Sequence, residues 1–179
     1  MAEIYKIGSD DLVDRVSTFG GTNYAQYSGP GLVVSHLTSG NEYIAINIGT
    51  AANNIPSGST VTVSFDLEMK VVTANPTLLV YNTNNKGPMQ FNNASKTYTA
   101  AANTTLKQHC VYTSTITARG SQATTTNNYL EFYSTYNTGN VFSISNLKLE
   151  IGNKPTDWTP ALEDLVTYDS STSSLVFFQ

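Results

Sequence analysis

The fold is decided by residues 61–71, which read Val61-Thr62-Val63-Ser64-Phe65-Asp66-Leu67-Glu68-Met69-Lys70-Val71. Every second residue of this stretch is apolar, and every residue in between is polar. Successive side chains of a β-strand point to opposite faces of a sheet, so this period of two predicts one long strand. One face of the strand is expected to be buried and the other to be wet.

The same pattern recurs more weakly along the rest of the chain. Further strands are predicted at residues 32–37, 42–48, 77–81, 108–117, 129–136 and 141–151. Turn residues, such as those at 53–59, separate these segments. Short strands joined by turns predict an all-β protein, built as an antiparallel β-sandwich or jelly roll.

Alternation also predicts which side chains form the core. We expect one core between two sheets, shared by the inward residues Val63, Phe65, Leu67, Leu130, Phe132, Ile144 and Leu149. The alternation shifts register inside the last strand, and Asn146 is expected to mark a β-bulge there.

Two end segments flank this body. Residues 9–19 predict a short helix, because Ser9 can cap its start and Gly20-Gly21 can end it. This helix would be a lid on the sandwich or a docking helix. The apolar run at 175–178 predicts a strand that pairs with a sheet edge, in its own subunit or a neighbouring one. The expected division is an N-terminal segment with a short helix (1–22), a β-sandwich (23–162) and a C-terminal tail (163–179).

Composition excludes several classes of function. Charged residues make up 12% of the chain and the net charge is −4, whereas nucleic-acid binding requires a basic patch. No stretch approaches the roughly 18 apolar residues of a membrane span, and no basic segment followed by an apolar run marks a secretory signal. Cys110 is the single cysteine, so no disulfide forms within the chain. We expect a protein made in the cytoplasm, without membrane insertion.

No catalytic or metal-binding pattern is present in the sequence. His109 and Cys110 are neighbours on a predicted strand, so they point to opposite faces and cannot share a metal. No Gly-x-Ser-x-Gly motif occurs. The outward acids Asp66, Glu68 and Glu131 show no pattern that would predict the paired geometry of a glycosidase. The sequence therefore predicts neither an enzyme nor a metal centre.

Aromatic and acidic side chains on the outward side of the strands predict one ligand surface, on which Tyr129, Glu131 and Tyr133 lie beside Asp66 and Glu68. Aromatic rings stack on the flat faces of a sugar, while carboxylates and amides bond its hydroxyls, and a sugar pocket combines the two. The candidate glycan-binding residues are Tyr129, Glu131, Tyr133, Asp66, Glu68, Tyr81 and Tyr43. The alternative is that the outward tyrosines shield the sheet or form a subunit contact.

A longer motif lies near the C-terminus. Residues 146–152 read Asn-Leu-Lys-Leu-Glu-Ile-Gly, and residues 156–164 read Thr-Asp-Trp-Thr-Pro-Ala-Leu-Glu-Asp. This motif resembles the end of a carbohydrate-binding-module-like β-sandwich domain of bacteriophage tail, baseplate and fibre proteins. In that family a last strand of the form N-L-K-L-E-x-G precedes T-D-W-T-P-A-x-E-D. The close match covers residues 141–164, and the rest of the chain matches only in its strand pattern.

The resemblance implies a virion component that adheres or assembles, but it does not identify a ligand. Together with the outward aromatic and acidic residues, it predicts a non-enzymatic virion protein of the tail, baseplate or fibre that adheres to glycans on the host surface. Its partners would be other virion proteins and copies of itself, with a trimer as the expected symmetry. The alternative is a purely structural decoration or adaptor subunit of capsid or tail, which uses the same sandwich for protein contacts. Relatives often hold a structural calcium ion near the last strand. Asn146 stands there in place of an acid, so no cofactor is predicted and calcium stays an open alternative. Trp158 is expected to pack across the domain edge and to fix the direction of the tail.

Overall fold

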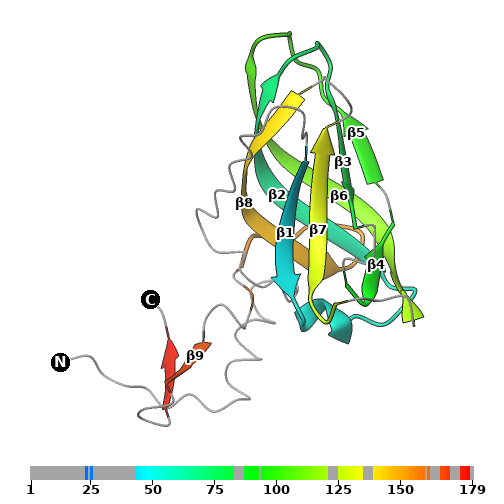
Figure 1. Ribbon diagram of the computed structural model, residues 1–179, viewed down its shortest axis with the longest axis vertical. Helices are drawn as coiled ribbons and strands as arrows, with labels where there is room; N and C mark the ends of the chain where they lie inside the picture. The colour runs from blue at the N-terminus through cyan, green and yellow to red at the C-terminus, as the bar shows by residue number, and fades with distance from the viewer. Residues whose placement is uncertain are drawn as a thin grey trace, which may run out of the picture.

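The protein is an antiparallel β-sandwich, seen here in a computed structural model (Figure 1). The residues described are 23, 25, 43–82, 87–92, 94–120, 125–134, 139–159, 161, 166–169 and 174–177. The first sheet has the order β1 (Tyr43–Gly49), β7 (Asn128–Ser134), β3 (Thr77–Tyr81), β5 (Ala94–Thr97). The second has the order β4 (Met89–Phe91), β6 (Thr105–Ala118), β2 (Thr60–Val71), β8 (Gly139–Ile151). A 3-10 turn, η1 (Ala51–Asn54), follows β1.

The strand expected at 61–71 is β2, and it lies inside the second sheet, between β6 and β8. Its alternate apolar side chains are all buried. The outward side is only partly wet, because Thr62 and Ser64 are buried as well. The hydroxyl of Thr62 donates to the carbonyl oxygen of Gly152 at 2.8 Å, so the chain leaving β8 covers this end of β2.

One core fills the space between the sheets, and all seven residues expected there belong to it. Phe65 is at its centre. The ring of Phe65 stacks on Tyr112 of its own sheet, and it meets Phe132 of the opposite sheet edge to face at 4.8 Å. The shared apolar face is what joins the two sheets into one domain.

A β-bulge in β8 confirms the expectation for Asn146. The pairing passes from Ser64 with Lys148 to Asp66 with Ser145, so two residues of β8 stand opposite Phe65 alone. Asn146 has a φ of +50°, in the left-handed region that asparagine tolerates. Without this extra residue the alternation from Ile144 would turn Lys148 inward. The bulge turns the apolar side chains that follow it inward instead.

The two shortest strands of the sandwich, β4 and β5, were not predicted, because three or four residues are too few to show a period. The helix expected at 9–19 and the strand expected at 32–37 lie outside the described residues. In the tail, β9 (Val166–Asp169) pairs with β10 (Ser174–Phe177) in a small antiparallel sheet of its own. Within its own chain the apolar run thus pairs with β9, and pairing with a sheet edge of a neighbouring subunit stays a prediction. A short connection makes the neighbouring segment the easiest partner to reach.

Candidate functional site

The structure separates the seven predicted ligand residues onto two sheets. Tyr43, Tyr81, Tyr129, Glu131 and Tyr133 belong to β1, β3 and β7 of the first sheet. The other two acids, at positions 66 and 68, belong to β2 of the second sheet. The prediction that these groups lie side by side on one face is therefore wrong. Alternation shows that a residue points away from the core, but it does not show to which sheet a strand belongs.

The outer face of the first sheet is partly buried. The rings of Tyr81 and Tyr133 meet edge to face at 6.3 Å, and both side chains are half-buried, as is Tyr129. Glu131 is only 4% exposed, so its carboxylate is not open to a ligand, contrary to the expectation of a wet face. Burial lowers the pKa of the Arg119 guanidinium, although the nearby carboxylate of Glu131 opposes that shift. The aromatic half of the predicted site is thus packed.

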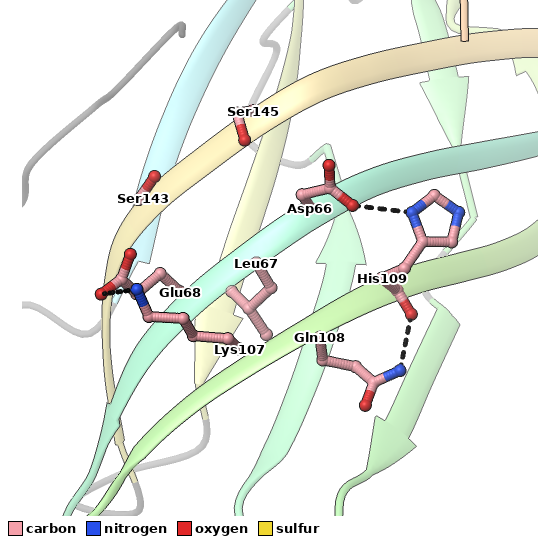
Figure 2. A pocket seen from close by; sticks show the side chains of 8 residues that line it. All are labelled: Asp66, Leu67, Glu68, Lys107, Gln108, His109, Ser143 and Ser145. Atoms are coloured by element: carbon pink, nitrogen blue, oxygen red, sulfur yellow. Dashed lines mark hydrogen bonds and ion pairs between the residues drawn. The ribbon is translucent and has the colours of Figure 1, made fainter. Parts of the chain in front are cut away.

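The outer face of the second sheet carries a hollow of about 310 Å³ across β8, β2 and β6 (Figure 2). Its wall carries hydroxyl, carboxylate, ammonium, amide and imidazole groups beside apolar carbon. The lining residues are Asp66, Leu67, Glu68, Lys107, Gln108, His109, Ser143 and Ser145.

Strand register explains why these side chains gather. Across the three strands, Asp66 stands between Ser145 of β8 and His109 of β6. Two residues further along, Glu68 stands between Ser143 and Lys107. The hollow therefore consists of two parallel cross-strand rows, which we call the Asp66 row and the Glu68 row. Each row presents a hydroxyl, a carboxylate and a nitrogen base in the same order.

The charged groups of the hollow are paired with one another. His109 Nδ1 lies 2.8 Å from Asp66 Oδ1, and Asn146 Nδ2 donates to Asp66 Oδ2 at 2.7 Å. Burial raises the pKa of Asp66, but these hydrogen bonds outweigh it, so the net pKa lies below the usual value. In the other row, Lys107 Nζ lies 3.2 Å from Glu68 Oε1. The Asp66 carboxylate is thus held ionised, and the carboxylate of each row lies between a basic side chain and a serine.

The Asp66 row contains the residue types of a hydrolase triad in an order that cannot work. A triad needs the imidazole between the carboxylate and the serine, so that it can take the serine proton. Here Asp66 stands in the middle, and Ser145 and His109 are two strands apart, or about 9.5 Å at the usual strand spacing. The row can bind hydroxyl groups, but its histidine cannot activate its serine.

The Asp66 carboxyl is not suited to acid catalysis either. A glycosidase holds one carboxyl protonated by raising its pKa, whereas the pKa of Asp66 is lowered. The single thiol is no substitute. Burial raises the pKa of Cys110 to about 11, although the Tyr98 hydroxyl bonded to it at 3.1 Å opposes that shift. A reactive cysteine needs the opposite shift.

The C-terminal motif forms a structural element that sequence reasoning missed. Residues 152–159, which we call the exit strap, run back over the outer face of β8. Trp158 is half-buried and donates its indole N–H to the carbonyl oxygen of Leu147 at 3.3 Å, as expected of a residue that fixes the exit direction. Asn23 donates to Leu147 and Thr159 and accepts from the backbone N–H of Leu149. The signal in the sequence was the pair of charges, Lys148 and Glu150, inside an otherwise apolar strand.

Five polar residues of the hollow were also not among the predicted ligands: Lys107, Gln108, His109, Ser143 and Ser145. None of them is a tyrosine or an acid, the two residue classes that guided the choice, and only the sheet order shows that they flank Asp66 and Glu68. In the described part of the chain, no group of three or more His, Cys, Asp or Glu side chains is placed to hold a metal ion. The same residues include no helix with the length and apolar character needed to cross a membrane.

Comparison with known proteins identifies no family. No family model matches the chain, and no curated protein matches it. Among solved structures, the chain is similar to one described as the tripod from the baseplate of bacteriophage Tuc2009, with 14% identity and a TM-score of 0.42. The match covers 88% of this chain and 63% of that chain, so the present chain spans less than two thirds of it. At this level the likeness establishes neither a shared function nor a ligand.

Proposed function

We propose that the protein is a non-enzymatic component of a bacteriophage virion, in the tail, baseplate or fibre, that adheres to glycans on the host surface. The location in a virion, and assembly with other virion proteins and with copies of itself, rest on the motif at residues 141–164. The adhesive role rests on one observation. Two cross-strand rows of hydroxyl, carboxylate and nitrogen groups converge on one hollow, at Asp66 and Glu68.

The chemistry of the hollow favours an uncharged sugar. Asp66 faces His109, and Glu68 faces Lys107, so each carboxylate already has a basic partner. An anionic glycan would compete with these carboxylates for the same basic side chains, whereas the hydroxyls of a neutral sugar can bond beside the pairs. Each hydrogen bond adds only about 0.5–1.5 kcal/mol net. Adhesion would then depend on several copies binding together.

A purely structural adaptor role is the second candidate, and a different surface favours it. The half-buried tyrosines around Glu131 form a packed aromatic face, as subunit contacts do. In that reading the first sheet contacts capsid or tail proteins, and the polar hollow is a solvated sheet face.

A binding assay separates the two candidates. Protein clustered on fluorescent beads is applied to an array of neutral and anionic oligosaccharides, as wild type and as Ser143→Ala/Ser145→Ala. We expect binding to neutral oligosaccharides and a loss of roughly tenfold in the double variant, since two hydrogen bonds disappear. Ser95→Ala, an exposed serine on β5, is the matched control and should bind as wild type. Binding that survives in the serine variant but is lost in Tyr129→Ala/Tyr133→Ala would show that the site lies on the aromatic face of the first sheet. The absence of any glycan binding would favour the adaptor role.

A further inference from the structure

Lys148 is an unusual residue for the outer side of a sheet, because its side chain is completely buried. The bulge at Asn146 turns it outward, away from the apolar core, and the exit strap then covers it. A buried ammonium loses its hydration, and this loss is strongly destabilising unless protein groups replace the water. Its surroundings are therefore the feature to explain.

Three oxygens from β8 and the exit strap surround the ammonium. Lys148 Nζ donates to the Asp157 carbonyl oxygen at 2.6 Å and to Thr156 Oγ1 at 2.7 Å, and it lies 3.7 Å from Glu150 Oε2. The Thr156 hydroxyl in turn donates a hydrogen bond to Glu150 Oε2 at 2.7 Å. The backbone N–H of Thr156 donates to Glu150 Oε1 at 2.8 Å. In this series every hydrogen bond pairs one donor with one acceptor, and no group has to donate the same hydrogen twice.

These ligand types are those of a hard metal ion. A carboxylate, a hydroxyl and a backbone carbonyl are oxygen donors of the kind that hold Ca²⁺ in proteins. Here the ammonium of Lys148 takes the place that such an ion would occupy. A calcium ion near the last strand, which the resemblance implies as an alternative, therefore does not fit these residues.

We propose that Lys148 is a built-in cation that locks the exit strap onto β8 in place of a bound metal ion. The oxygen cage formed by Glu150, Thr156 and Asp157 is then a cation site that the chain fills with its own side chain. The direction in which the chain leaves the sandwich is consequently fixed without calcium. This inference concerns the strap alone and is independent of the proposed glycan binding.

Trp158 makes the lock measurable, because it is the only tryptophan of the chain and lies in the strap. Its fluorescence and the melting temperature are recorded for wild type, Lys148→Met, Thr156→Val and Lys154→Met, each with excess EDTA and with excess calcium. Lys154 is an exposed lysine of the same segment and is the matched control. Wild type and the control are expected to give the same values in EDTA and in calcium.

Lys148→Met is expected to melt roughly 10 °C lower, because it leaves Glu150 buried without its cation. Its Trp158 emission should shift to the red below the melting temperature, which a uniform loss of stability would not cause. Thr156→Val, which keeps the shape and removes the relay hydroxyl, should show the same red shift. Lys148→Ala leaves the oxygens and opens space, so calcium should raise its melting temperature and not that of wild type.

Three outcomes would overturn the proposal. Wild type could melt lower in EDTA than in calcium, which would show that a metal is bound. Lys148→Met could keep the wild-type melting temperature and emission, which would show that the ammonium does not hold the strap. Calcium could fail to stabilise Lys148→Ala, which would show that the cage is not a cation site.

Discussion

Replacement of Phe65 by alanine tests the arrangement of the two sheets most severely. Phe65 is completely buried, and its ring contacts one ring from each sheet: Tyr112 at 5.8 Å and Phe132 at 4.8 Å. A Phe-to-Ala change in a packed core costs about 3–5 kcal/mol, and each aromatic pair contributes about 0.5–1.5 kcal/mol beyond its buried area. Because two pairs are lost at once, we expect a loss in the upper half of that range, about 4–5 kcal/mol.

The assay is equilibrium unfolding in urea, followed by Trp158 fluorescence and by circular dichroism. The expected result is a lower midpoint with an unchanged slope, since the slope reports the surface exposed on unfolding. Val72→Ala is the control, because Val72 is 41% exposed and its truncation should change stability by less than about 0.5 kcal/mol. A loss below about 1 kcal/mol for Phe65→Ala would refute the assignment of this ring to a core shared by both sheets.

Three further predictions concern single polar residues. Asn146→Val should lower the free energy of unfolding by about 2 kcal/mol, because a β-branched residue resists the φ of +50°. Asn146→Gly should lower it less. Equal urea midpoints for the two variants would contradict a bulge in the left-handed region. Asp66 has a lowered pKa in the folded state, so the stability that it contributes is present above the unfolded pKa of about 3.9 and is lost as pH falls through the folded pKa. The difference in urea midpoint between wild type and Asp66→Asn should therefore shrink in acid. A difference that grows below pH 4 would contradict the sign of the shift. Asn23→Ala should lower the free energy of unfolding by about 2–3 kcal/mol, because it leaves the N–H of Leu149 and the carbonyl oxygen of Thr159 without this hydrogen-bond partner. Thermal unfolding measures the loss, and a neutral effect would show that Asn23 does not hold these segments together.

Much of the fold followed from the period of the sequence. The long alternation at 61–71 placed β2 to within one residue, and the break in alternation at Asn146 located the bulge. These features are local, because side-chain direction along a strand depends only on neighbouring residues. The inward residues of distant strands then had one core to share, so the list of core residues also followed.

The site followed only in part, because it depends on the order of strands in a sheet. Asp66 and Glu131 both point away from the core, but they lie on opposite sheets, and no pattern in either strand distinguishes the two. The burial of Glu131 and of Lys148 was missed for a related reason. An outward residue is exposed to solvent only if no other segment covers it. The alternation within one strand cannot show that residues 152–159 return over β8, because this contact depends on the tertiary structure. The low charge of the chain predicts that nucleic acid is not a partner, but it could not place a ligand.

The central claim is that the hollow across β8, β2 and β6 binds a neutral sugar. The most direct measurement is an NMR titration of isotope-labelled protein with the neutral oligosaccharide that binds best on the array, followed by backbone amide and imidazole signals. The account predicts shifts concentrated at Asp66, Glu68, His109, Ser143 and Ser145, with the signals of β1, β3 and β7 unchanged. Shifts concentrated instead around Tyr81, Tyr129 and Tyr133, or no shifts with any neutral oligosaccharide, would contradict it.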